Sequence, residues 1–298
     1  MLVDSFLFGG NHEDDLLFLK FVLENDGVDL WIIQENSFSL QGKEKGLFAN
    51  EVLKQERFKP YLDKVKVVSN NINPLNGSEE HQNFQREGWQ RTFCYNELTS
   101  LPEDTLVIVS DVDEMIDFSD KSRKERFFTD VSTDRTSWVQ RQRYWYLYNN
   151  KCFLDSIRIP VIPLKIVLGN PSALPQTRHF HDPNRTFGGL VNPIGFEYSY
   201  VFRSLEDIQT KKDTYAHTGF TVESVRGGLY LNCWPRSKQR GEKIEWKKDD
   251  LFEIVELSEQ NSPKYIREHL EELNPKTVDL NYKENRKNWT SEFTDYDK

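Results

Sequence analysis

The feature that most constrains this fold is an apolar run that ends in a group of acids, at residues 106–114. The run Leu-Val-Ile-Val at 106–109 leads through Ser110 into Asp-Val-Asp-Glu at 111–114. A continuous apolar run bounded by polar residues predicts a buried strand of a parallel sheet. Ligands of open α/β sheets bind just outside the carboxyl ends of such strands. We therefore expect Asp111 and Asp113 to lie at a functional site.

The spacing of these two aspartates suits a divalent cation. In continued strand geometry, residues two positions apart point to the same side. Two carboxylates on one side offer the oxygen ligands that Mg²⁺ or Mn²⁺ prefer, often together with a phosphate-bearing substrate. The alternative is a solvated turn, because Asp-x-Asp can arise by chance in an acidic chain. The strand before the motif favours the metal site.

The first 114 residues alternate predicted strands and helices. We expect strands at 2–8, 28–33, 65–68 and 106–110, and helices at 13–25, 47–58 and 79–98. This order predicts parallel strands joined by right-handed crossovers, as in a Rossmann-type nucleotide-binding half. The Gly-x-Gly-x-x-Gly fingerprint of dinucleotide enzymes is missing from the sequence, so a hydride-transfer cofactor is not expected.

The second half of the chain has a different character. Residues 137–148 are dense in Trp, Tyr and Arg and predict a strand, whose rings either pack in the core or form a platform for a sugar. The remaining predicted segments are a strand at 157–168, a loop-rich stretch at 169–194, an aromatic turn at 195–200, a helix at 204–212, mostly helix from 221, and a frayed polar tail from 280.

We treat the chain as one domain, residues 1–298, because it contains no internal repeat and no flexible linker. Its parts are a nucleotide-sugar half at 1–114, an acceptor half at 115–230, and a mostly helical region at 231–298.

The net charge of −9 disfavours a general nucleic-acid or anionic-membrane binder. The odd number of widely spaced cysteines, 3 in all, favours reduced thiols. With no signal peptide or membrane span in the sequence, we expect a cytoplasmic protein without a transmembrane segment.

Six short blocks of this sequence occur in the order in which a known family has them. They are Asp4–Phe8, Ile32–Asn36 followed by Ser39–Lys45, Phe84–Arg86, Val109–Glu114, Tyr144–Asn149, and Gly195–Tyr200 followed by Ala216-His217. In these blocks the chain resembles glycosyltransferase family 17, the family of the bisecting β-1,4-N-acetylglucosaminyltransferase, and its bacterial and viral relatives. The resemblance covers about residues 1–230.

The resemblance implies a GT-A fold, an α/β architecture in which a Rossmann-like half with a mostly parallel sheet is fused to an acceptor-binding half. It implies an inverting, metal-dependent transfer from a nucleotide-diphosphate sugar to a hydroxyl of a glycan acceptor. The donor is expected to be UDP-linked, with UDP-N-acetylglucosamine as one candidate, and the metal Mn²⁺ or Mg²⁺. The alternative is a transferase of the same fold that uses another donor sugar, for a surface polysaccharide or a glycoprotein glycan.

The expected catalytic centre follows from the same resemblance. Asp113 is our candidate for the direct metal ligand, and Asp111 would coordinate through water or hold the ribose. His217 would complete the metal site, although a structural histidine is the alternative. Glu197 is the candidate general base, because an acceptor hydroxyl needs one. One departure bears on this assignment: the family has Gly-Trp-His where this chain has Gly-Phe-Glu at 195–197. The reserve candidates for the base are Asp182 and Asp213.

Further residues are expected to hold the donor and the acceptor. Our candidates for nucleotide-sugar binding are Glu35, Lys43, Lys45, Arg86, Ser110 and Asp111. Our candidates for acceptor binding are Tyr144, Trp145 and Tyr146. For the lysines the alternative is a solvated loop, and for the aromatic residues it is packing in the core.

Three other classes of protein share part of this pattern. A HAD-type phosphatase also has Asp-x-Asp after a strand, but near its N-terminus. A nucleotidyltransferase would need a Gly-rich phosphate loop, which Gly9-Gly10-Asn11-His12 does not provide. A catalytically inactive carbohydrate-binding relative would not need both Asp111 and Asp113.

Overall fold

The computed structural model describes most of the first 216 residues and short parts of the rest. The described residues are 1–77, 79–145, 147–152, 158–179, 182–188, 192–199, 201, 205–216, 234–236, 245–247 and 252–273.

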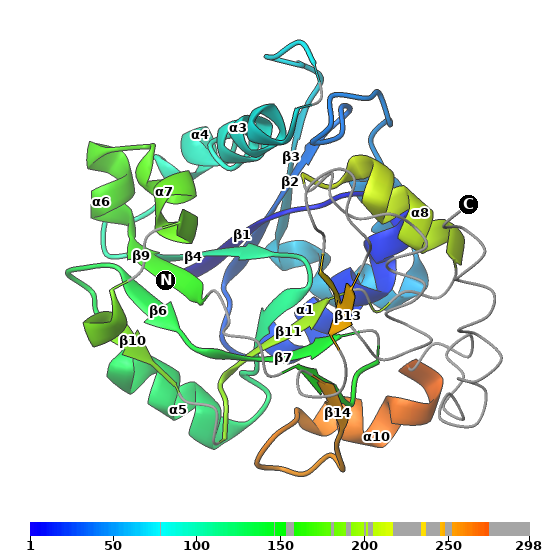
Figure 1. The fold of residues 1–298 in the computed structure, drawn as a ribbon. Coiled ribbons are helices and arrows are strands. Elements are labelled where there is room, and N and C mark those ends of the chain that lie inside the picture. The colour runs from blue at the N-terminus through cyan, green and yellow to red at the C-terminus, as the bar shows by residue number, and fades with distance from the viewer. Residues whose placement is uncertain are drawn as a thin grey trace, which may run out of the picture.

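Four parallel strands form one side of a seven-stranded sheet (Figure 1). They are β1 (Leu2–Leu7), β2 (Leu30–Asn36), β3 (Val65–Asn70) and β4 (Leu106–Asp111), and they lie in the order β4-β1-β2-β3. Both faces of β4 are buried, since Leu106 and Ile108 pack into one apolar cluster and Val107 and Val109 into another. The predicted Rossmann-type order of the first half is therefore confirmed.

The other three strands of this sheet come from later in the chain. They are β9 (Ile159–Pro163), β6 (Ser137–Val139) and β10 (Thr186–Phe187). β9 runs antiparallel to β4 and to β6, so the sheet is mixed on this side.

A second, five-stranded sheet is formed almost entirely after residue 113. It consists of β5 (Glu114–Ile116), β7 (Arg141–Trp145), β8 (Asn150–Cys152), β11 (Gly195–Ser199) and β14 (Phe252–Ile254), in the order β14-β8-β7-β11-β5. The single strand predicted at 137–148 is therefore wrong. It breaks at Gln140, whose backbone N–H donates to Phe187 O, and the chain passes from the first sheet (β6) to the second (β7).

The helices cover both faces of the first sheet. On one face lies α1 (Asp14–Glu24). On the other face lie α3 (Glu80–Gln90), α4 (Tyr95–Leu98), α6 (Leu164–Gly169) and α7 (Ala173–His179), as Figure 1 shows. The remaining helices of the first 216 residues are α2 (Ala49–Val52), the 3₁₀ helices η1 (Asn11–Glu13), η2 (Glu56–Lys64) and η3 (Pro183–Arg185), α5 (Lys121–Asp130) and α8 (Leu205–Thr214).

Three predicted segments are corrected by these elements. The helix expected at 47–58 is only α2, and the 3₁₀ helix η2 follows it with Pro60 inside, which would break an α-helix. The strand expected at 157–168 ends at Pro163 and continues as α6, and the loop expected at 169–194 contains α7.

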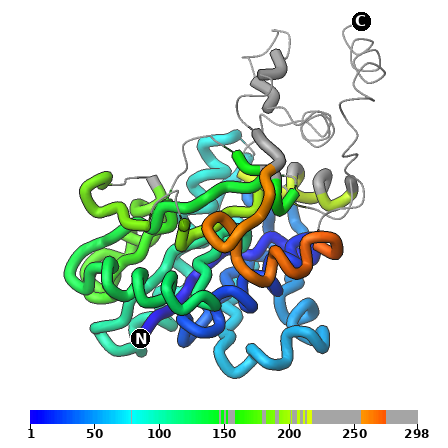
Figure 2. The backbone as a smooth tube through the Cα atoms, turned by 90° about the horizontal axis from the view of Figure 1, so that it is seen from below, coloured from blue at the N-terminus to red at the C-terminus, as the bar shows by residue number. Residues whose placement is uncertain are grey.

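The described residues after 230 contain strands as well as a helix. They form β12 (Trp234–Arg236) paired with β13 (Glu245–Lys247), then β14 and α10 (Lys264–Leu273). Helix α10 lies against the N-terminal segment (Figure 2), where the rings of Tyr265 and Phe18 are 6.3 Å apart. The mostly helical region predicted from 231 is therefore mixed in its described part, and the predicted tail from 280 lies outside the described residues.

Among the helices that the structure describes, none combines the length and the apolar character needed to cross a membrane.

Candidate functional site

The two aspartates lie where the two sheets meet. Strand β4 ends at Asp111 and β5 begins at Glu114, so Val112 and Asp113 form a turn between the sheets. The Asp111 backbone N–H donates to Glu114 Oε2 (3.0 Å), and the Tyr198 N–H donates to Asp113 O (2.9 Å). The strand therefore does not continue through the motif, and it is this turn that brings Asp113 to the site.

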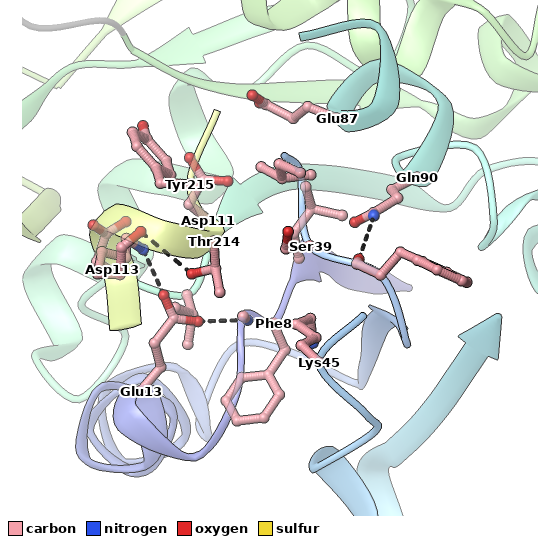
Figure 3. Close-up of a pocket in the computed structure, with 16 residues that line it drawn as sticks. Phe8, Glu13, Ser39, Lys45, Glu87, Gln90, Asp111, Asp113, Thr214 and Tyr215 are labelled. Atoms are coloured by element: carbon pink, nitrogen blue, oxygen red, sulfur yellow. Dashed lines mark hydrogen bonds and ion pairs between the residues drawn. The ribbon is translucent and has the colours of Figure 1, made fainter. Parts of the chain in front are cut away.

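A cavity opens at this turn, outside the carboxyl ends of β1 and β4, and its empty space, open solvent included, is about 610 Å³. Figure 3 shows Glu13, Asp111, Asp113 and Tyr215 on one side of it and Ser39, Lys45 and Gln90 on the other. The residues that line it are Leu7, Phe8, Gly9, Glu13, Phe38, Ser39, Leu40, Lys45, Glu87, Gln90, Asp111, Val112, Asp113, Lys211, Thr214 and Tyr215. Both aspartates thus lie in one cavity, at the end of the sheet where α/β proteins bind ligands.

Asp111 is held by two arginines. Its Oδ1 lies 2.6 Å from the Arg91 guanidinium and its Oδ2 lies 2.7 Å from that of Arg178. Burial would raise the pKa of Asp111, but Arg178 and Arg91 hold it well below its usual range. Asp111 is therefore a permanent anion whose oxygens already have cationic partners.

Asp113 has a different environment. Among the described residues, none donates a hydrogen bond to its carboxylate. Burial, together with the nearby carboxylates of Asp111, Glu197 and Glu13, raises the pKa of Asp113 to about 6, although Lys211 opposes the shift. Asp113 is therefore the carboxylate of the turn that is open to a cation.

Glu197 lies in a buried ion network instead of a turn. It is on β11, next to the central strand β7, and its Oε2 is 2.7 Å from both Arg141 Nη2 and Arg143 Nε. Its Oε1 accepts a hydrogen bond from the Ser199 hydroxyl. Burial would raise the pKa of Glu197, but Arg141 and Arg143 lower it. A carboxylate with these partners has a weak affinity for a proton, which disfavours the expected role of general base.

The two reserve candidates for the base lie elsewhere. Asp182 caps η3 through the Asn184 N–H and is 3.1 Å from Arg185. Asp213 is half-exposed and 4.0 Å from Lys43. Neither of them lines the cavity.

Sequence reasoning missed Glu13 and Lys211, which meet in the cavity. Glu13 Oε1 forms an ion pair with Lys211 of α8, and Glu13 Oε2 accepts from the Gly9 N–H at 2.6 Å. The sequence predicts Glu13 as the first residue of a helix at 13–25. Glu13 is instead buried on η1, the first helix after β1. Ligands bind at the carboxyl ends of parallel strands, so its position just after a predicted strand could have marked it as a site residue.

Ser110 belongs to a charged cluster beneath the site, not to the cavity. Its hydroxyl donates to Asp4 Oδ1 (2.7 Å) and accepts from Lys20 Nζ (3.0 Å). Lys20, fully buried on α1, also lies 2.6 Å from Asp4 Oδ2 and donates to Glu114 O at 2.6 Å. These partners within the protein disfavour the predicted nucleotide-sugar contact of Ser110, which instead supports the turn from below.

The predicted donor residues of the second strand and its loop separate in space. Glu35 caps α2, because its oxygens accept from the N–H groups of Phe48 (2.7 Å) and Ala49 (2.9 Å), and it does not line the cavity. Lys45 does line the cavity, and its Nζ lies 3.5 Å from Glu35 Oε1. The Lys43 side chain is 60% exposed and lies outside the cavity.

Arg86 organises the loops around the cavity instead of lining it. Its guanidinium donates to the carbonyls of Leu40 (3.1 Å) and Leu75 (2.9 Å) and to Asn73 Oδ1 (3.0 Å). Gly42 has φ +78°, and a Cβ there would come 2.9 Å from Arg86 Nη2, so glycine is needed for this close approach. These protein oxygens occupy the donors of Arg86, which disfavours its predicted contact with the nucleotide sugar.

The predicted sugar platform is part of the core in its described portion. Tyr144 is fully buried, its hydroxyl donates to Asn261 O (2.6 Å), and its ring stacks on Tyr198. Trp145 is also buried, with the Arg143 guanidinium 4.9 Å from its ring centre. The packing alternative is therefore correct for both residues. Tyr146 and the expected metal ligand His217 lie outside the described residues.

The part of the chain that the structure describes contains no group of three or more His, Cys, Asp or Glu side chains arranged to hold a metal ion. A cation at this turn would therefore need ligands beyond the described side chains.

The model of glycosyltransferase family 17 matches residues 1–233. This chain belongs to glycosyltransferase family 17. No curated protein matches it. Family membership makes the protein a glycosyltransferase, which uses a sugar donor and a glycan acceptor, and it excludes the phosphatase and nucleotidyltransferase hypotheses. The cavity at the carboxyl ends of β1 and β4 lies wholly within the matched residues.

Proposed function

We propose that this family 17 enzyme has a GT-A fold and transfers a sugar, with inversion, from a UDP-linked donor to a glycan hydroxyl. The observation that carries the proposal is the position of Asp113. It lies in a cavity at the carboxyl ends of parallel strands, beside Asp111, and its carboxylate receives no hydrogen bond from the described residues. UDP-N-acetylglucosamine is one candidate donor.

The site fits one divalent cation, Mn²⁺ or Mg²⁺, with Asp113 as its direct protein ligand. Burial beside three further carboxylates raises the pKa of Asp113, so the ionised group gains from a cation. These ions are often held by one or two carboxylates together with substrate phosphates and water, so a full set of protein ligands is not required. When bound, the cation would stabilise negative charge on the diphosphate.

Asp111 would act on the donor without a direct bond to the cation. Its two oxygens are paired with Arg91 and Arg178, which fix the carboxylate at the rim of the cavity. Its place beside Asp113 suits a contact to the ribose or to a water molecule. Lys45, the predicted lysine that lines the cavity, would meet the diphosphate. His217 stays a prediction as a further metal ligand.

The acceptor hydroxyl must lose its proton as it attacks the anomeric carbon, while the bond from that carbon to the phosphate oxygen breaks. Glu197 remains the sequence-based candidate for the base, and its ion pairs with Arg141 and Arg143 count against it. Replacement of Glu197 by Gln distinguishes a general base from a partner in a structural ion pair.

A screen of nucleotide sugars for thermal stabilisation tests the proposed function, because a ligand that binds only the folded state raises the midpoint of unfolding. We expect UDP and UDP-sugars to stabilise the protein with Mn²⁺ present and to lose most of this effect in EDTA. Release of UDP from the stabilising donor then distinguishes an enzyme from an inactive carbohydrate-binding relative. Equal stabilisation by all nucleotides, or by none, would contradict the proposal.

A further inference from the structure

The cavity contains a buried cation that the proposed function has not used, the ammonium group of Lys211. Lys211 lies on α8, and its side chain is 16% exposed. It lines the cavity together with Asp111 and Asp113, and it forms an ion pair with Glu13. Its positive charge lowers the pKa of Asp113, so the two groups interact electrostatically within the cavity.

Glu13 holds this ammonium group from a rigid position. Its side chain is 2% exposed, and its second oxygen accepts from the Gly9 N–H at 2.6 Å. A Cβ on Gly9 would come 2.9 Å from Glu13 Oε2, so the glycine lets the carboxylate approach the backbone. Burial would raise the pKa of Glu13, but Lys211 and His12 lower it, so the pair is ionic.

The end of α8 is fixed to the nucleotide half on the other side. Thr214 O accepts from the Leu40 N–H (3.0 Å), Tyr215 O from Gln41 Nε2 (3.1 Å), and Ala216 O from Asn83 Nδ2 (2.9 Å). These bonds join the C-terminal end of α8 to the loop at residues 40–41 and to helix α3. Lys211 is therefore held by its ion pair with Glu13 of η1 on one side and by the hydrogen-bonded C-terminal end of α8 on the other.

The charge balance of the cavity shows what Lys211 contributes. The acidic side chains that line it are Glu13, Glu87, Asp111 and Asp113, and the basic ones are Lys45 and Lys211. Burial lowers the pKa of Lys45. Burial would also lower the pKa of Lys211, but Glu13 and Asp113 raise it above its ordinary value. Lys211 therefore keeps its positive charge inside a mainly acidic cavity.

We propose that Lys211 is a catalytic residue that donates a hydrogen bond to the leaving diphosphate, and that Glu13 positions it. This inference rests on the proposed function, since it needs a diphosphate donor in the cavity. As the bond between the anomeric carbon and the phosphate oxygen breaks, the electron pair stays on that oxygen. The ammonium group stabilises the added charge without giving up its proton, and the attacking hydroxyl passes its own proton to a general base or to water. Fixed donors aimed at developing charge act in this way in many enzymes.

The test uses the full chain, Mn²⁺ and UDP-N-acetylglucosamine, with release of UDP in the absence of acceptor as the rate. Lys211→Met should lower kcat by about 10²-fold, the usual loss for one such donor, with a much smaller change in the KM of the donor. Lys211→Arg keeps the charge and should recover part of the rate. Lys54→Met is the matched control, because Lys54 is an exposed lysine outside the cavity.

The double variant Glu13→Gln/Lys211→Met separates catalysis from stability. Lys211→Met alone leaves the Glu13 carboxylate buried without its cation, so it should destabilise the protein. The second substitution, Glu13→Gln, removes this unpaired negative charge. We expect the double variant to recover thermal stability but not kcat. Recovery of both would mean that the ion pair is only structural, and an unchanged kcat in Lys211→Met would overturn the inference. A wild-type enzyme that neither binds UDP nor releases it would instead contradict the proposed function itself.

Discussion

Asp111 and Asp113 lie two positions apart on one turn, yet their surroundings shift their pKa values in opposite directions. Arg178 and Arg91 hold the pKa of Asp111 below its ordinary range, whereas burial among other carboxylates raises that of Asp113 to about 6. Environments that separate the pKa values of two neighbouring acids often mark their different roles. Here the paired aspartate suits a fixed structural anion, and the unpaired one suits the binding of a cation.

The stability of the metal-free protein should depend on pH through Asp113. Its pKa is raised in the folded state, so the folded protein binds this proton more tightly than the unfolded chain does. Stability from this group is therefore greatest at low pH and is lost as pH rises from about 4 towards 6. Asp113→Asn removes the effect, and above pH 6 it should be more stable than the wild type by about 1–3 kcal/mol. Denaturant unfolding in EDTA at pH 5 and pH 8 measures the difference in unfolding free energy between Asp113→Asn and the wild type. An equal increase in stability at both pH values would contradict this prediction.

Arg178 should stabilise the turn by joining two carboxylates. It lies 2.7 Å from Asp111 Oδ2 and 2.5 Å from Glu114 Oε2. Arg178→Met leaves both acids short of a cation, and we expect a loss of roughly 2–4 kcal/mol of unfolding free energy. Arg185→Met is the matched control, because that exposed pair with Asp182 should contribute less than about 1 kcal/mol. Similar losses in the two variants would show that the buried network is not what fixes the turn.

Replacement of Glu197 should affect stability more than turnover. Glu197→Gln weakens the ion pairs with Arg141 and Arg143 in the middle of the second sheet. We expect a lower midpoint of thermal unfolding, with kcat within about tenfold of the wild type when it is measured well below that midpoint. A loss of about 10²–10⁴-fold in kcat with unchanged stability would restore Glu197 as the general base.

The hydroxyl of Tyr144 should matter for folding and not for the donor. It donates to Asn261 O, so it joins the second sheet to the segment before α10. Tyr144→Phe should cost about 1–2 kcal/mol of unfolding free energy and leave UDP binding unchanged. Tyr95→Phe serves as the control, since the Tyr95 hydroxyl bonds to none of the described residues. An unchanged stability of Tyr144→Phe would put its hydroxyl back among the candidates for sugar binding.

The parts of the site that sequence reasoning found are those that local patterns define. The apolar run before Asp111 predicts a buried strand, and the strand–helix order before it predicts the parallel sheet. The rule that ligands bind at the carboxyl ends of parallel strands failed for Glu35, because this acid caps α2. Whether such a carboxylate faces a ligand or a helix terminus depends on the loop that follows, which the strand pattern does not describe.

Residues that act through distant contacts could not be predicted in this way. Lys211 meets Glu13 from 198 positions away, and nothing in the sequence around Lys211 marks it. Arg86 is a predicted nucleotide-sugar ligand, but its guanidinium donates to carbonyls of two separate loops. The aromatic residues from 137 to 148 read as one strand, and only the tertiary structure shows that β6 and β7 belong to different sheets.

Calorimetric titration of UDP into the wild type and Asp113→Ala, with Mn²⁺ present, tests the donor site most directly. The account predicts metal-dependent binding of UDP to the wild type and none to the variant. Metal-dependent binding of UDP to Asp113→Ala with wild-type affinity would contradict the central claim.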